Sequence, residues 1–214
     1  MREQGFGEDN IESLYLLGPE TEWQVQRYIP DIKIRDGATR NGLYNTSNRF
    51  KRKVKPQDTL FIYFQHHGVL DRNINNGEPS IELRWENPGD DNYFIPVSEF
   101  ANVIKQISAK RIVLLTRQCY GSNFGAKFRE LLPDRDVTVF SFALPNERAY
   151  DTETDISRMF GTTFAKVPIL KDKQYDTDYD GHVSLSEAVK ALEKRRTANK
   201  PQLIGSDFYF PKQI

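Results

Sequence analysis

The sequence contains little cysteine: Cys119 is the single one among 214 residues. A lone cysteine cannot form an intramolecular disulfide, which argues against a small secreted domain held together by disulfides. No apolar stretch approaches the roughly 20 residues that a membrane-spanning helix needs, and residues 1–10 are too polar for a signal peptide. We therefore expect a soluble protein without membrane contacts, for which a cytoplasmic location is favoured.

An excess charge of either sign is also absent, since 30 Lys and Arg residues balance 30 Asp and Glu residues. Such a chain has no overall field that would attract nucleic acid, and we expect no nucleic-acid partner. At 38% hydrophobic residues the chain can bury the core of one domain, but not comfortably of two. The composition thus predicts a single domain over residues 1–214 and leaves the oligomeric state open.

Three apolar runs are typical of buried strands in a parallel sheet. They lie at 60–64, 112–116 and 137–142. Apolar residues at helical spacing separate these runs, at 98–107 and 124–132, with Ser98 as the expected cap of the first helix. The resulting β-α-β-α-β order predicts an α/β fold, in which right-handed crossovers make the strands parallel and place helices on the faces of the sheet.

Local sequence patterns predict the secondary structure of the remaining segments. Apolar spacing predicts a short helix over 11–17, alternation predicts a strand within 22–34, and a turn at Asp36-Gly37 precedes a predicted helix over 38–50. The stretch 71–96 is rich in Asn, Gly, Pro and Asp, which indicates a long loop with a short hairpin around 81–85. Long loops near strand ends often carry binding functions.

Reactive side chains follow two of the predicted strands. The first strand leads into His67-Gly68 and the second into Cys119. Because open α/β sheets hold ligands at the carboxyl ends of their strands, an imidazole there can help to generate a thiolate. The pattern predicts a catalytic dyad of His67 and Cys119, with the N–H groups of Gly68 and Cys119 as oxyanion donors. The alternative is a histidine at a strand end and a buried thiol that acts as a small hydrophobe.

The segments 61–68 and 114–122 resemble the motifs around the catalytic histidine and cysteine of caspase-like cysteine peptidases, the group of legumains, metacaspases and caspases. The first motif is most similar to the legumain version. Segments 36–39, 141–147 and 201–205 also resemble that group, so that the likeness covers roughly residues 36–205. It implies a three-layer fold with a mostly parallel sheet and helices on both faces, and a cysteine endopeptidase that hydrolyses peptide or protein substrates through His67 and Cys119.

The chain departs from this family in three places. The apolar strand and helix that normally open the domain have no convincing equivalent, so that an N-terminal strand is expected to be missing. His66 stands where the family often has glycine or aspartate, and Arg117 stands where an acidic residue or glutamine is common. The alternative to a peptidase is therefore a catalytically inactive caspase-like domain that acts as a calcium-stabilised binding scaffold.

The resemblance also implies which residues border the primary specificity pocket. They are Arg117, Gln118, Ser141 and Glu147. An arginine offers a planar, permanently charged fork suited to a carboxylate, which predicts a preference for acidic residues before the scissile bond. Alternatively, Arg117 pairs with a local carboxylate such as Glu147 and has no role in substrate binding.

An acidic segment, 176–187, matches the twelve-residue EF-hand calcium loop at every defining position. The predicted oxygen ligands are Asp176, Asp178, Asp180, the carbonyl of His182, Ser184 and Glu187, with Gly181 at the sharp turn. This pattern predicts a structural Ca²⁺ ion between helices at 156–164 and 188–192. The alternative is a capping box, Ser184 to Glu187, preceded by a solvated acidic turn.

Overall fold

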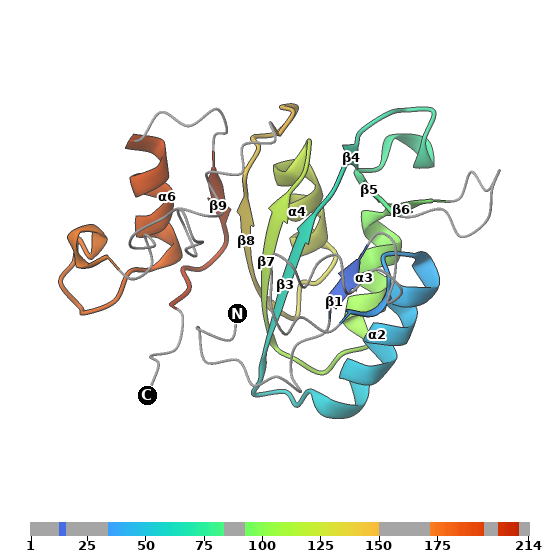
Figure 1. The fold of residues 1–214 in the computed structure, drawn as a ribbon, viewed down its shortest axis with the longest axis horizontal. Coiled ribbons are helices and arrows are strands. Elements are labelled where there is room, and N and C mark those ends of the chain that lie inside the picture. The colour runs from blue at the N-terminus through green and yellow to red at the C-terminus, as the bar shows by residue number, and fades with distance from the viewer. Residues whose placement is uncertain (1–12, 16–33, 84–92, 150–171, 195–200, 210–214) are drawn as a thin grey trace.

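The computed structural model describes residues 13–15, 34–83, 93–149, 172–194 and 201–209. Its centre is a four-stranded sheet in the order β3-β7-β8-β9 (Figure 1). The strands are β3 (Thr59–Gln65), β7 (Arg111–Arg117), β8 (Asp136–Ser141) and β9 (Gln202–Ile204). The first three are parallel and β9 is antiparallel to β8. The three predicted strands and their parallel arrangement are therefore confirmed.

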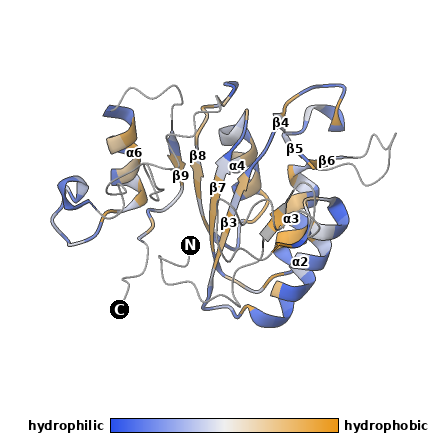
Figure 2. Cartoon of the chain, in the orientation of Figure 1, coloured by the Kyte–Doolittle hydropathy of each residue, from blue (hydrophilic) through white to orange (hydrophobic). Residues whose placement is uncertain are grey.

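Four described α-helices surround the sheet: α2 (Arg40–Lys53), α3 (Val97–Lys105), α4 (Gly121–Glu130) and α6 (Leu185–Lys194). Successive residues of β7 point to opposite faces. Ile112 and Leu114 join a core cluster with residues of α3 and α4, whereas Val113 and Leu115 join a second cluster with residues of α6. Figure 2 shows β7 and β8 as apolar strands between these layers. The protein is a mixed α/β structure with helices on both faces of a mainly parallel sheet.

The starts of two helices show how local chemistry sets their limits. Thr39 accepts a hydrogen bond from Gly42 N at 3.0 Å, so that α2 begins just after this cap, within the predicted 38–50. The predicted cap at Ser98 is wrong, because Pro96 is the N-cap residue of α3. Ser98 lies inside the helix, where its N–H and hydroxyl donate to the Glu78 carboxylate at 2.7 and 2.9 Å.

Two small sheets flank the large one. One consists of the antiparallel strands β4 (Gly68–Val69), β5 (Ser80–Glu82) and β6 (Phe94–Pro96). The hairpin predicted around 81–85 lies partly outside the described residues, and residues 81 and 82 belong to β5. The other pairs β1 (Ser13–Tyr15) with β2 (Ile34–Gly37) in parallel.

The helix predicted over 11–17 is wrong for its described part, because pairing with β2 makes Ser13–Tyr15 a strand. Such long-range pairing overrides a short helical pattern. Most of the strand predicted within 22–34, and all of the helix predicted over 156–164, lie outside the described residues. Among the described helices, none is long and apolar enough to cross a membrane.

Candidate active site

The two predicted catalytic segments leave the sheet side by side. Strands β3 and β7 pair in parallel, and their last paired residues are Gln65 and Arg117. The chain continues into His66-His67 from one strand and into Gln118-Cys119 from its neighbour. The order of the strands therefore brings residues that are far apart in the sequence to one edge of the sheet, as the sequence predicted.

Gly68 is the residue where these two segments approach most closely. A Cβ atom placed on Gly68 would lie 2.1 Å from the carbonyl oxygen of Cys119 and 3.1 Å from its carbonyl carbon. Both atoms belong to the backbone, which cannot swing aside as a flexible side chain can. A residue with a side chain therefore cannot occupy this position unless the Cys119 segment moves.

The backbone N–H of Gly68 is not used in the pairing of β4 with β5. The carbonyl of His67 accepts from Glu82 N at 3.0 Å, and Gly68 faces Ile81 in the adjacent position. In antiparallel pairs, hydrogen-bonded positions alternate with positions whose N–H and C=O groups point outward. The Gly68 N–H thus points away from β5 and can serve a bound group.

Replacing Gly68 with alanine is expected to lower the free energy of unfolding by about 1–3 kcal/mol, the usual penalty for forcing extra atoms into a packed site. Denaturant unfolding would measure this change. Val69→Ala, which removes atoms from the next residue of β4, is the matched control and should have a smaller effect. A Gly68→Ala protein as stable as the wild type would contradict the close contact with Cys119.

Cys119 is half-buried and lies at a sharp bend between β7 and α4. The next residue, Tyr120, has φ = 59°, in the left-handed region that non-glycine residues rarely adopt. Its N–H donates to the carbonyl of Glu147 at 2.8 Å, which helps to hold the strained turn. This feature could not be foreseen from the sequence, because tyrosine is not a typical residue for left-handed backbone.

The thiol does not contact the predicted base in this structure. The Cys119 Sγ donates a long hydrogen bond to the carbonyl of Ala149 at 3.9 Å. Within the described ranges no hydrogen bond links Cys119 to His67. Catalytic hydrogen bonds are often long or misaligned without substrate, so this geometry is compatible with a dyad that tightens when substrate binds.

The two adjacent histidines have different surroundings. His67 is exposed, whereas His66 is half-buried and its Nδ1 atom is buried without a hydrogen-bond partner among the described residues. Their rings are perpendicular, with centroids 5.5 Å apart. Burial lowers the pKa of His66 below its ordinary value, against the opposing effect of the Glu82 carboxylate. His66 is therefore neutral near pH 7, and His67 is the imidazole that solvent and ligands can reach.

The residues predicted to border the specificity pocket lie near the same edge of the sheet. Three of them are buried: Arg117, Gln118 and Ser141 are 6%, 1% and 0% exposed. The Ser141 hydroxyl accepts from Ala143 N at 3.2 Å and donates to the Ala143 carbonyl at 2.8 Å, so that it stabilises its own turn. Glu147 reaches the Cys119 turn through its carbonyl, as described above, and its side chain is partly exposed.

The acidic loop brings three of its predicted metal ligands together. Asp176, Asp178 and Glu187 each offer a carboxylate oxygen, and these oxygens lie within 4.8 Å of one another. The Asp176 carboxylate also accepts from Asp180 N at 3.1 Å and from Gly181 N at 2.9 Å, which closes the loop around it. Gly181 has φ = 89°, as a glycine at the sharp turn requires.

The carboxylate of Asp180 is not part of this cluster, and the other predicted ligands, His182 and Ser184, follow it in the loop. The Asp180 carboxylate accepts from His182 N at 2.8 Å, and His182 is half-buried. The Ser184 hydroxyl lies 3.3 Å from a Glu187 oxygen. Ser184 N donates to Glu187 at 3.0 Å, and Glu187 N donates to Ser184 Oγ at 3.3 Å. The capping box is therefore present, at the start of α6, together with the carboxylate cluster.

Glu187 is the most enclosed member of the cluster, at 5% exposure. Burial alone would raise the pKa of its carboxyl, but hydrogen bonds from Ser184, Thr177 and Asp178 hold the pKa below its ordinary value. It is thus ionised at neutral pH, beside two further carboxylates. All of these donors are oxygens, the ligand type that hard divalent cations prefer. The residues present fit such a cation.

The loop is anchored at the amino end of β7, away from Cys119. The Asp207 carboxylate accepts from Ser186 N at 3.0 Å at the start of α6, and Arg111 donates to the Asp207 carbonyl at 2.8 Å. The Arg111 guanidinium also lies 5.1 Å from the centre of the Phe208 ring. Arg111 opens β7 and Cys119 follows its end, and seven strand residues span roughly 20 Å. The anchor of the acidic loop therefore lies at the opposite end of β7 from Cys119.

Comparisons with known proteins bear on the fold. No protein-family model matches the sequence, and no curated protein matches it. Among solved structures, protein GSU0716 from Geobacter sulfurreducens is similar, with a TM-score of 0.52 and 11% sequence identity over 79% of this chain and 74% of that chain. At this identity the similarity supports the α/β fold alone.

Proposed function

We propose that this protein is a cysteine endopeptidase with a caspase-like fold. The observation that carries the proposal is the contact of Gly68 with the backbone of Cys119 at the ends of two adjacent parallel strands. Three groups lie near this contact: the exposed imidazole of His67, the partly accessible thiol of Cys119, and the backbone N–H of Gly68, which points away from β5. These are the parts that covalent thiol catalysis needs.

In the proposed reaction the Cys119 sulfur attacks the carbonyl carbon of the scissile peptide bond. His67 takes the thiol proton and delivers it to the nitrogen of the leaving amine, so that the amine departs and an acyl-enzyme remains. The N–H groups of Gly68 and Cys119 stabilise the negative oxygen of each tetrahedral intermediate. Water, activated by His67, then hydrolyses the thioester, which releases the acid and restores the thiol.

Arg117 gives the pocket its proposed preference for acidic residues before the scissile bond. Its side chain is buried at the end of β7, two residues before Cys119. A guanidinium in such a position recognises a carboxylate through paired, charge-assisted hydrogen bonds. Gln118, Ser141 and Glu147 complete the proposed border of this pocket.

The acidic loop is proposed to bind a structural Ca²⁺ ion. Asp176, Asp178 and Glu187 would supply carboxylates, and Asp180, the His182 carbonyl and Ser184 would supply further oxygens. The ion would offset the repulsion between converging carboxylates and hold α6 against the sheet. The anchoring through Asp207 and Arg111 supports this structural role.

Labelling with acyloxymethyl ketones that carry Asp, Asn or Arg beside the reactive group tests the peptidase proposal. Wild-type protein is expected to be labelled, with the Asp probe fastest, and Cys119→Ala is expected to remove all labelling. Mass spectrometry of the intact protein would measure it. Labelling that survives the substitution, or the absence of labelling by every probe in folded protein, would contradict a peptidase.

An inactive caspase-like scaffold is the second candidate. It is favoured by the absence, among the described residues, of a hydrogen bond between His67 and Cys119, whose thiol is oriented toward Ala149. A folded protein that no probe labels would support this alternative.

A further inference from the structure

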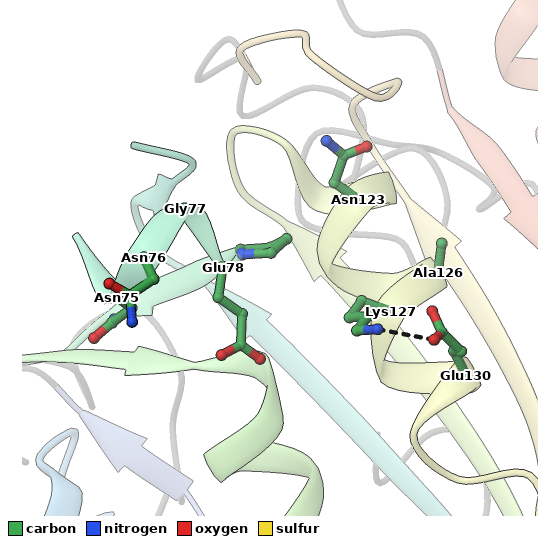
Figure 3. A pocket seen from close by; sticks show the side chains of 9 residues that line it. Asn75, Asn76, Gly77, Glu78, Asn123, Ala126, Lys127 and Glu130 are labelled. Atoms are coloured by element: carbon green, nitrogen blue, oxygen red, sulfur yellow. Dashed lines mark hydrogen bonds and ion pairs between the residues drawn. The ribbon is translucent and has the colours of Figure 1, made fainter. Parts of the chain in front are cut away.

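A groove of about 640 Å³, lined by both polar and apolar surface, lies between α4 and the turn that joins β4 to β5. We call it the α4 groove. One wall is the turn at 75–79, and the other includes Asn123, Ala126, Lys127 and Glu130 of α4. Figure 3 shows the turn and this side of the helix on opposite sides of the space.

Both walls of the α4 groove are continuations of the segments that carry the proposed dyad. Val69, just after His67-Gly68, pairs with Ser80, and the groove begins at the adjacent Pro79. On the other side Asn123 stands in the first turn of α4, four residues after Cys119. Helix α4 begins at Gly121, two residues after Cys119, so that Asn123 follows the proposed nucleophile closely along the chain. The groove therefore starts close to the proposed reaction centre.

The turn at 75–79, which forms one wall, has an unusual backbone conformation that side-chain hydrogen bonds hold in place. Asn75, Asn76 and Gly77 have φ values of 47°, 57° and 79°, a run of left-handed residues that is unfavourable unless its surroundings hold it. The Asn75 side chain donates to Ser80 Oγ at 2.9 Å. The neighbouring Glu78 carboxylate is held by the N–H and hydroxyl of Ser98, as described above. The sequence predicts only a long loop here, although Asn-Asn-Gly is a typical left-handed turn sequence.

The chemistry of the walls matches an extended peptide. The side-chain amide of Asn76 can donate and accept hydrogen bonds. Asn123 Nδ2 donates to Asn146 Oδ1 at 3.3 Å and keeps a second N–H and its oxygen, so that both amides complement the C=O and N–H groups of a peptide. Lys127 and Glu130 form an exposed ion pair at 2.8 Å. Such pairs contribute less than about 1 kcal/mol, so that a bound chain can displace this one easily. From Asn123 to Glu130 the helix rises about 10 Å, the length of roughly three extended residues.

We propose that the α4 groove binds the substrate on the leaving-group side, as about three extended residues that follow the scissile bond. This inference rests on the proposed peptidase function. It assigns to Asn76, Asn123 and Ala126 a role in substrate selection that the dyad and the Arg117 pocket do not supply.

Ala126→Trp tests the proposal, because an indole ring at this exposed position of α4 would fill the groove without disturbing the core. Two substrates share the residues before the scissile bond. One ends in a fluorogenic amine, and the other continues with about three polar residues and a quencher. Ala126→Trp is expected to lower kcat/KM at least about tenfold for the extended substrate, mainly through KM, and to leave the short substrate unchanged. Arg129→Trp, on the same helix and also exposed but outside the groove, is the matched control.

The outcomes separate the two proposals. Unchanged cleavage of the extended substrate by Ala126→Trp, or an equal decrease for both substrates, would overturn the α4 groove as a binding site while the peptidase proposal stands. If folded wild-type protein cleaves neither substrate, the peptidase proposal is wrong and the groove proposal falls with it. A selective loss with the extended substrate, absent in Arg129→Trp, supports both.

Discussion

Replacing His67 with alanine is expected to lower the second-order rate of Cys119 labelling by about 100-fold or more, which is the contribution of a positioned general base. His67 is expected to act as the base because its imidazole is accessible and is placed next to the Cys119 segment. His67 is the exposed imidazole and precedes Gly68, the residue in contact with the Cys119 backbone. Stopped labelling reactions, followed by mass spectrometry under excess probe, would give the rate constants.

His66→Ala is the matched control, because it removes the same side chain one residue earlier. We expect its labelling rate to stay within about tenfold of the wild type, since a half-buried, neutral imidazole does not reach the thiol. Equal losses in the two variants, or a larger loss for His66→Ala, would assign the base to His66 and contradict the proposed dyad.

His66 is expected to affect the pH dependence of the free energy of unfolding, and not the labelling rate. Its pKa is lowered in the folded protein, so the unfolded chain binds more protons as the pH falls below the ordinary value of 6.5. The contribution of neutral His66 to the free energy of unfolding is therefore full above pH 6.5 and is lost as the pH falls through the lowered pKa. His66→Ala should reduce the dependence of stability on pH in this range, as measured by denaturant unfolding at several pH values.

Calcium is expected to raise the melting temperature of the wild-type protein, and Glu187→Gln is expected to remove most of that increase. At a calcium concentration about 100 times its dissociation constant, binding to the folded state alone stabilises it by about 2.7 kcal/mol. For a domain of this size that corresponds to roughly 5–10 °C. Thermal unfolding with calcium, and with a chelator, would measure the shift.

Glu187 is chosen because it is the buried member of the carboxylate cluster, and glutamine keeps its size but removes one charged oxygen. Glu193→Gln on the exposed side of α6 is the control, and it should retain the full calcium shift. Because the loop is anchored at the amino end of β7, calcium should leave the labelling rate of Cys119 unchanged well below the melting temperature. If calcium does not change the melting temperature of the wild-type protein, the calcium proposal is wrong, and the segment serves only as the capping box of α6.

Local patterns predicted much of this structure where a segment's own residues decide its conformation. The continuous apolar run of β7 could only be a strand buried on both faces, and the spacing of Phe124 and Phe128 could only place one side of α4 in the core. The convergence of the Asp176 and Glu187 carboxylates was also predictable, because both residues lie within a single twelve-residue segment. In each case the signal that allows the prediction lies within one short segment of the sequence.

The α/β class, the parallel order of the three main strands and the residues at their carboxyl ends therefore follow from the sequence patterns alone. The fold as a whole makes Ser13–Tyr15 a strand, pairs Ser98 with Glu78 instead of leaving it to cap α3, and holds Tyr120 in the left-handed region. It likewise decided the contact of Gly68 with Cys119 and the opening of the α4 groove. These features depend on partners far along the chain, and the free energy of such contacts is set by packing that no local pattern contains.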